Sequence, residues 1–357
     1  MIGQRLKIAR AASGLSLREL EAEIDNLVTA QAIGKYERNE DMPSSKVLSA
    51  LATALHVSED YLLASDDLVL EGVEFRKKGM ESKREEAFVE GQALHLLERD
   101  LALEDALGLA SVVWDRPREA PYPVTAVADA ENAARAVRTN WGLGVDPILN
   151  LAELLEERGI KILSVDLSDI DGLTAKVRRK NGEPIPLIVI KENEWSERKR
   201  FTLAHELGHM VMDVRSGVNA EKAANRFAGA FLMPAEALWR EIGKHRTMIS
   251  LGELVRLKEL FGASFQAIVY RCHDLGIISD PAYRRLFQVF NEKGWRKPPY
   301  EELGALPASK EHPQRMQRLC FRALSEGLIS EAKAAEILGI SVRDLTRLMD
   351  QPSTPGL

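Results

Sequence analysis

The residues with the clearest chemical potential lie in the segment FTLAHELGHMVMD, which contains His205, Glu206 and His209 in the pattern H-E-x-x-H. On a helix, residues four apart lie about 40° apart around the axis and one turn apart along it, so both imidazoles can reach one ion. Glu206 follows the first histidine and can take a proton from a water molecule and pass it to a leaving amine. The spacing indicates a metal-dependent hydrolase with Glu206 as general base.

A catalytic zinc ion needs three protein ligands and an open position, so a third ligand must lie outside this motif. A histidine six residues after the second is excluded, because that position holds Arg215. The alternative is a carboxylate on the next expected helix, and Glu221 supplies one. Asn225 shares a helix face with Glu221 and can hydrogen-bond the outer nitrogen of a ligand histidine. We therefore expect His205, His209 and Glu221 to hold zinc, although the same nitrogen and oxygen ligands accept Mn, Fe or Co.

Several elements must position these side chains. Gly208 costs about 1 kcal/mol of helix propensity relative to alanine, so its presence indicates close packing beside the metal site. The dipeptide Asn181-Gly182 is a strong hairpin signal between the second and third expected strands. The expected elements are helices over 129–141 and 147–158, strands reading GIKILSVDL, DGLTAKVRR and PLIVIKE, and helices over 196–213 and 219–231.

The words FTLAHELGH, E-x-x-A-N-x-F-A and LMP follow one another at short distance, and this pattern resembles the ImmA/IrrE metallopeptidases. The upstream segments WGLGVDPILNLAELLEERGIKI and DGLTA are similar to the start of the same family, so the resemblance covers about 120–240. It implies a zincin-like endopeptidase of the thermolysin type in which Glu221 is the third ligand. It also implies specific processing of a transcriptional repressor and not general digestion.

Residues 1–65 show five short helical patterns with recognisable starts. Ser16 and Glu19 form a capping box before the second helix, and Thr29 caps the third. Ser44 or Ser45 begins the fourth, and Ser58 begins the fifth. The words LRELEAEI and TAQAIGKYERNEDMPSSKVLSALATALHVSEDYLL resemble the Cro/repressor-type (XRE) helix-turn-helix family.

In that fold the third helix lies in the major groove of DNA and its first side chains read base edges. The resemblance places Thr29 and Gln31 at base edges and Lys35 and Arg38 near phosphates. Glu37 is expected to stabilise the junction between the third and fourth helices. However, residues 1–65 hold seven Lys/Arg and nine Asp/Glu, a net charge of −2, which disfavours phosphate binding. A module that docks another protein, such as an XRE-type repressor, is therefore the alternative.

The 357 residues exceed the usual size of one domain and carry a net charge of −6, so no whole-protein basic field attracts nucleic acid. No signal peptide or long apolar stretch is visible, which predicts a cytoplasmic protein without membrane contact. Cys272 and Cys320 are expected to be reduced, buried thiols.

The fold class expected is α+β and mostly helical, with a small sheet in the peptidase. The expected division is a helix-turn-helix domain (1–65), a helical linker (66–120), a metallopeptidase domain (121–240) and a helical C-terminal extension (241–357) with a helix–turn–helix rhythm at 338–341.

These features predict a DNA-binding zinc metalloendopeptidase that cleaves a specific, repressor-like protein and binds operator DNA as a homodimer. A second interpretation is a transcription regulator or antitoxin, with a toxin as partner, whose peptidase-like domain senses a signal or binds a partner. Intact Glu206 argues against this, because a metal-binding scaffold needs no base. A third interpretation is self-cleavage within 66–120, which would release the DNA-binding domain.

Overall fold

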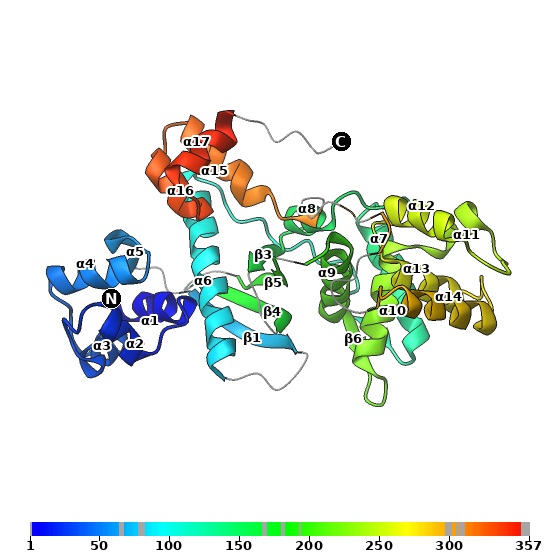
Figure 1. Ribbon diagram of the computed structural model, residues 1–357, viewed down its shortest axis with the longest axis horizontal. Helices are drawn as coiled ribbons and strands as arrows, with labels where there is room; N and C mark the ends of the chain where they lie inside the picture. Colours follow the sequence, from blue (N-terminus) through cyan, green and yellow to red (C-terminus); the bar gives the residue numbers. More distant parts are fainter. Residues whose placement is uncertain are drawn as a thin grey trace. The chain divides into compact units, whose positions relative to one another are not determined.

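The computed structural model describes residues 2–63, 68–77, 83–165, 170–179, 183–192, 194–296, 302–304, 306 and 311–350 (Figure 1). The chain forms two compact units, each assembled from segments that are distant in sequence. The first unit comprises Met1–Val113, Gly159–Val189 and Pro313–Leu357, and the second comprises Trp114–Arg158 and Ile190–His312. The structure is mostly helical with a small sheet, so the predicted α+β class is confirmed. The division into four consecutive segments stays a prediction.

Five short helices open the first unit. They are α1 (Gly3–Ala12), α2 (Leu17–Glu23), α3 (Ala30–Glu37), α4 (Ser45–Ala54) and α5 (Glu59–Leu63). The predicted capping box is present, because the Ser16 hydroxyl accepts from the Glu19 amide and the Glu19 carboxylate accepts from the Ser16 amide. The Thr29 and Ser44 hydroxyls cap α3 and α4 by accepting from the amides of Ala32 and Val47. One apolar side chain from each helix is fully buried in a common core: Leu6, Leu20, Ile33, Leu51 and Leu62.

A four-stranded sheet forms the middle of the first unit, with strand order β1-β4-β5-β3. The strands are β1 (Leu68–Lys77), β3 (Lys161–Val165), β4 (Ile170–Arg179) and β5 (Ile185–Lys191). The three strands predicted from the sequence are confirmed, while the Asn181-Gly182 turn lies outside the described residues. The prediction of a helix is wrong over Leu68–Lys77, because this segment pairs antiparallel with β4. Ladder hydrogen bonds and the burial of Leu68 outweigh the local helix propensity there.

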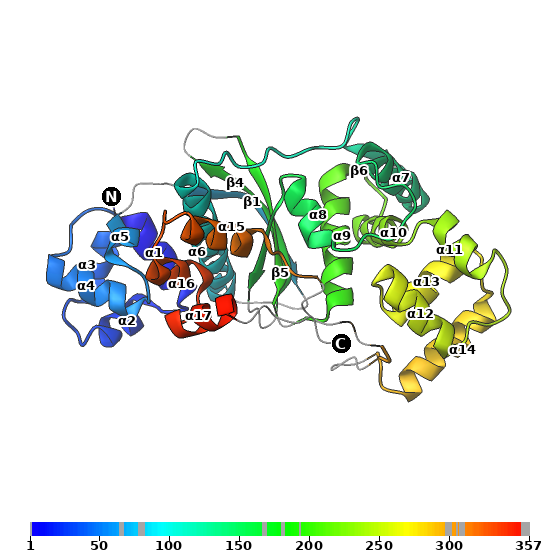
Figure 2. The same ribbon diagram turned by 90° about the horizontal axis from the view of Figure 1, so that it is seen from above.

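Helix α6 (Lys83–Ala106) packs between α1 and the sheet, as Figures 1 and 2 show. Their shared apolar cluster joins Ile8 of α1 and Leu97 of α6 to Val177 and Val189 of the sheet. A Cβ on Gly91 would lie 2.6 Å from the amide nitrogen of Ala12, so only glycine permits this approach of α6 to α1. The helical prediction for 66–120 is thus confirmed over α6.

The last three helices pack around the C-terminal end of α6 (Figure 1). They are α15 (Arg315–Ser325), α16 (Glu331–Leu338) and α17 (Val342–Asp350). The predicted helix–turn–helix at 338–341 is present, with Gly339 at φ 68° ending α16 in the left-handed conformation. Buried ion pairs tie these parts together: Lys161 Nζ lies 2.5 Å from Asp100 and 2.7 Å from Glu104, and Arg315 lies 2.9 Å from Glu104.

A half-buried histidine, His95, lies where α6 meets the helix-turn-helix. The ring of His95 lies edge-on to Tyr61 of α5, with centroids 5.1 Å apart. Burial, reinforced by the charges of Arg99, Arg5 and Lys333, lowers the pKa of His95 to about 3. The imidazole of His95 therefore stays neutral in the folded protein while the same histidine in the unfolded chain becomes protonated.

We expect His95→Phe to reduce the acid sensitivity of the first unit. An unfolded histidine titrates at a pKa of about 6.5, so between about pH 6.5 and 3 the unfolded chain binds more protons than the folded one. The free energy of unfolding therefore falls as pH drops through this window, and the phenylalanine variant should lose less of it. Urea unfolding at pH 7 and pH 5 measures the difference. His245→Gln at an exposed position is the control, and an equal decline in both variants contradicts the role of His95.

The second unit contains a two-stranded parallel sheet of β2 (Tyr122–Val124) and β6 (Met212–Val214) and is otherwise mostly helical over its described residues. Its helices are η1 (Val127–Asp129), α7 (Ala130–Asn140), α8 (Leu151–Glu157), α9 (Ser196–Val211), α10 (Ala220–Leu232), α11 (Ala235–Ile242), α12 (Leu251–Phe261), α13 (Phe265–Asp274) and α14 (Asp280–Glu292). The helix predicted over 196–213 ends two residues early, because Met212 and Asp213 pair with β2. Cys272 and Cys320 are buried free thiols, as predicted. Among the described residues, no helix is long and apolar enough to cross a membrane.

Candidate metal centre

Two helices of the second unit carry the candidate site. Helix α9 presents His205, Glu206 and His209, and α10 begins at an Asn219 cap whose side chain accepts from the amide of Lys222. A Cβ on Gly208 would lie 3.0 Å from the Phe227 ring, so this glycine allows α10 to lie directly against α9. The close packing predicted at Gly208 is confirmed.

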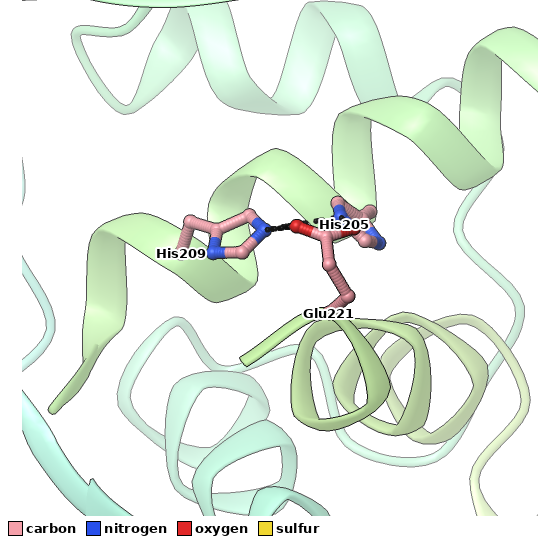
Figure 3. A group of neighbouring side chains, drawn as sticks. All are labelled: His205, His209 and Glu221. Carbon is pink, nitrogen blue, oxygen red and sulfur yellow. Dashed lines mark hydrogen bonds and ion pairs between the residues drawn. The ribbon is translucent and has the colours of Figure 1, made fainter. Parts of the chain in front are cut away.

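The side chains of His205, His209 and Glu221 converge between these helices (Figure 3). The two Nε2 atoms lie 3.0 Å apart. The Glu221 carboxylate places Oε2 3.4 Å from His205 Nε2 and Oε1 3.3 Å from His209 Nε2. The structure thus brings together all three side chains that the sequence singled out, although 16 residues separate the first from the last.

The donor atoms fit a small divalent ion. Ligands at about 2.0–2.1 Å from a tetrahedral zinc ion lie about 3.4 Å from one another. Each imidazole lies at about this distance from one oxygen of the Glu221 carboxylate, at 3.4 Å from Oε2 for His205 and 3.3 Å from Oε1 for His209. The 3.0 Å between the two imidazole nitrogens is a few tenths of an ångström shorter than this value, and a small side-chain rotation removes the difference. Two imidazole nitrogens and one carboxylate oxygen are also the ligand types of catalytic zinc sites.

Asn225 supports the deepest of these side chains. Its Oδ1 lies 3.0 Å from Nδ1 of His205, whose side chain is fully buried. Because the amide oxygen can only accept, this contact places the imidazole proton on Nδ1 and leaves the Nε2 lone pair directed at the cluster. Asn225 lies one helical turn after Glu221, so α10 contributes both a cluster member and the group that orients His205.

We expect Asn225→Ala to weaken zinc binding by about 10–100-fold, because the His205 imidazole loses the acceptor that fixes its tautomer and orientation. Competition with a chromophoric chelator measures the affinity. Asn225→Asp is the matched control, since it keeps an acceptor oxygen at the same place and should retain most of the affinity. An alanine variant that binds zinc as tightly as the parent would assign Asn225 a purely structural role.

The exposure of the site is uneven. The side chain of His205 is 1% exposed and that of His209 24%, whereas the side chain of Glu221 is 66% exposed. Glu206 is buried beside His205 on α9. The cluster therefore has a solvent side, at Glu221, and an interior side, at His205 and Glu206.

Buried ionic contacts that the sequence analysis missed hold α9 in place. Arg200 of α9 donates to Glu311 at 2.9 Å and to the carbonyls of Ile148 and Leu149. Glu311 also accepts from the amide of Ala152 at 2.6 Å, in the first turn of α8. Burial lowers the pKa of Arg200 and raises that of Glu311, while their mutual attraction opposes both shifts. The two residues lie 111 positions apart, so no local pattern signals the pair.

The residues predicted to contact DNA all lie on the solvent side of the helix-turn-helix. Thr29, Gln31, Lys35 and Arg38 are exposed. Two of them are engaged within the protein: the Thr29 hydroxyl caps α3, and Arg38 pairs with Glu40 at 2.7 Å.

Glu37 has a structural role, as expected, but it joins a different pair of helices. Glu37 binds Arg10 of α1 at 2.6 Å, so it joins the third helix to the first and not to the fourth. The reason is geometric, because the last turn of α3 lies alongside α1, where the amide of Gly3 at the start of α1 also donates to Asn39.

Comparison with known families gives two matches. Residues 155–273 match the family described as IrrE N-terminal-like domain, and residues 6–62 match a helix-turn-helix family. The chain is thus similar to an XRE-type helix-turn-helix and to an ImmA/IrrE-like domain, the combination that the sequence analysis predicted. The first match includes the whole His205, His209 and Glu221 cluster and Asn225, and the second includes α3. Comparison with curated proteins and with solved structures gives no match.

Proposed function

We propose that this protein is a zinc metalloendopeptidase that also binds DNA and cleaves a specific, repressor-like protein. The convergence of His205, His209 and Glu221 carries the proposal, because two imidazoles and a carboxylate on adjacent helices are the ligand set of a catalytic zinc ion. The matches to a metallopeptidase-like family and to a helix-turn-helix family support the two halves of the proposal.

Each side chain of the site then has a distinct task. His205, His209 and Glu221 hold the ion, and Asn225 keeps Nε2 of His205 unprotonated. A bound zinc ion supplies Lewis acidity, which polarises the substrate carbonyl and makes water more acidic. Glu206 accepts the proton of the attacking water on its carboxylate and delivers it to the nitrogen of the leaving amine. The 66% exposure of the Glu221 side chain leaves this edge of the site open to solvent.

The decisive experiment is incubation of the zinc-loaded protein with candidate XRE-type repressors, followed by mass spectrometry of the fragments. The proposal predicts one divalent metal per chain by elemental analysis and a small number of discrete cleavage products. Tight metal binding without cleavage of any candidate would favour the regulator or antitoxin, and co-purification of a toxin would identify its partner. Fragments of the protein itself, with new termini between residues 66 and 120, would indicate self-cleavage.

DNA binding by α3 makes a separate prediction. We expect the chain to bind an inverted repeat as a homodimer, with two third helices in successive major grooves about 34 Å apart. Gln31→Ala should then cost about 1–3 kcal/mol at one base position and have little effect on random DNA. Lys35→Ala is the control, because loss of a phosphate contact weakens binding to all sequences alike. Gel-shift titration against the gene's own upstream region, at two salt concentrations, separates the two effects.

One structural observation favours the alternative of a protein-docking module. The helix-turn-helix segment is acidic overall, and the Glu40 carboxylate accepts two hydrogen bonds from the Arg38 guanidinium. Both features weaken attraction to phosphates. If no upstream fragment is preferred over random duplex, residues 1–65 are better described as a surface that captures an XRE-type repressor for cleavage.

A further inference from the structure

A cluster of four charged side chains links α10 to α7 and α13. Glu131 of α7 accepts two hydrogen bonds from Arg271 of α13, at 2.5 and 2.6 Å. Arg226 of α10 donates to the same carboxylate at 3.0 Å and also pairs with Asp274 of α13. Glu131 is thus the one carboxylate in this cluster of described residues that binds both arginines by hydrogen bonds.

The cluster holds α10 by hydrogen bonds at two points along the helix. Arg226 restrains the middle of the helix, directly after Asn225 in the sequence. Arg271 donates through Nε to the carbonyl of Met233, the C-terminal cap of α10, at 3.0 Å. Both arginines are shielded from water, with side-chain exposures of 17% for Arg226 and 1% for Arg271. Charge-assisted hydrogen bonds in such surroundings are strong and directional, so they resist rotation and sliding of the helix.

Rotation of α10 is what the candidate metal site depends on. Consecutive residues of a helix lie about 100° apart around its axis, so a restraint on Arg226 also sets the direction of Asn225. Glu221 lies one turn earlier and reaches the histidines from a largely exposed side chain. A rotation of about 20° at a side-chain radius of about 6 Å moves a donor atom by about 2 Å, which is enough to break a metal ligand set.

We propose that Glu131 is a positioning residue for the metal site, which holds Arg226 and Arg271 so that α10 presents Glu221 and Asn225 to the histidines of α9. The inference rests on the proposed function, since it assumes that the cluster binds zinc. Charge balance acts in the same direction. Glu131 and Asp274 balance Arg226 and Arg271, so removal of the Glu131 charge leaves one excess positive charge near a site for a dication.

The test is the zinc affinity of Glu131→Gln in the full-length protein, measured by chelator competition. We expect a loss of about tenfold or more, the lower end of what outer-sphere substitutions cause. Glu131→Asp keeps the charge and should recover part of the affinity. Glu302→Gln is the matched control: it removes the charge of another buried glutamate of the second unit, whose partner Lys258 lies on α12, and should leave the affinity unchanged.

Two further measurements separate positioning from general destabilisation. The visible absorption of the cobalt-substituted protein reports ligand geometry, so it should change in Glu131→Gln and not in Glu302→Gln, even where their urea unfolding curves coincide. In an Asn225→Ala background the effect of Glu131→Gln should shrink, because the contact between Asn225 and His205 that the orientation of α10 maintains is already lost. Unchanged affinity and an unchanged cobalt spectrum in Glu131→Gln would overturn the inference. Absence of zinc binding by the parent protein would instead overturn the proposed function.

Discussion

We expect Glu206→Gln to reduce proteolysis by about 10²–10⁴-fold or more while the protein keeps its metal and its fold. The substitution keeps the size of the side chain and one acceptor oxygen but removes the carboxylate that accepts the proton of the attacking water. His205, His209 and Glu221 are unaffected, so metal content should stay at that of the parent. Because glutamine has the same size and shape as glutamate, the replacement should change stability far less than activity.

Single-turnover cleavage of the identified substrate measures the effect, with elemental analysis on the same samples. Glu236→Gln provides the control, because this glutamate is exposed on α11 and pairs only peripherally with Arg135 at 3.6 Å. A Glu206→Gln protein that cleaves as fast as the parent would show that another group serves as the base. Loss of metal from that variant would instead show that Glu206 helps to hold the ion.

The parts of the site that could be predicted from the sequence are those that local spacing determines. His205 and His209 share a helix face because they are four residues apart, and Glu221 and Asn225 do so for the same reason. The helix starts at Ser16 and Thr29 were also predictable, because a capping side chain bonds an amide only a few residues away. Gly208 was recognisable as a contact point because a glycine inside a helix needs a compensating reason.

The parts that could not be predicted depend on contacts between distant residues. The segment Leu68–Lys77 has charged residues and no helix-breaking proline, and it becomes a strand only because β4, a hundred residues later, offers a partner. The same holds for the bond between Arg200 and Glu311, and for that between Glu131 and Arg271. In the sequence, each of these charged residues resembles one on the solvent-exposed face of a helix. Its burial and its ion pair can be recognised only in the folded structure.

The interleaving of the two units has the same origin. The strands that precede α9 in sequence pack with α6 and the N-terminal helices, while α9 itself belongs to the other unit. From the sequence alone, consecutive segments are assigned to one domain, because the sequence does not indicate which distant elements a strand will pack against. The predicted metallopeptidase segment is therefore similar to a known family over a range that contributes residues to both units.

Removal of the metal should markedly destabilise the second unit. A ligand that binds only the folded state stabilises it by RT ln(1 + [L]/Kd), which is about 4 kcal/mol at a free zinc concentration of a thousand times Kd. The candidate ligands lie on two helices, α9 and α10, and unfolding separates them, so the folded protein alone presents the complete set. We expect a chelator to lower the unfolding temperature and added zinc to restore it.

His209→Ala should abolish this response to zinc, because it removes one of three ligands, and leave the unfolding temperature of the chelated protein close to that of the parent. His273→Ala is the matched control: His273 lies in the same unit, is 34% exposed and binds Asp280, and its loss should leave the zinc response intact. Thermal unfolding followed by circular dichroism, with and without chelator, compares the three proteins. If His209→Ala gains as much stability from zinc as the parent does, the ion binds elsewhere and His205, His209 and Glu221 do not form the metal site.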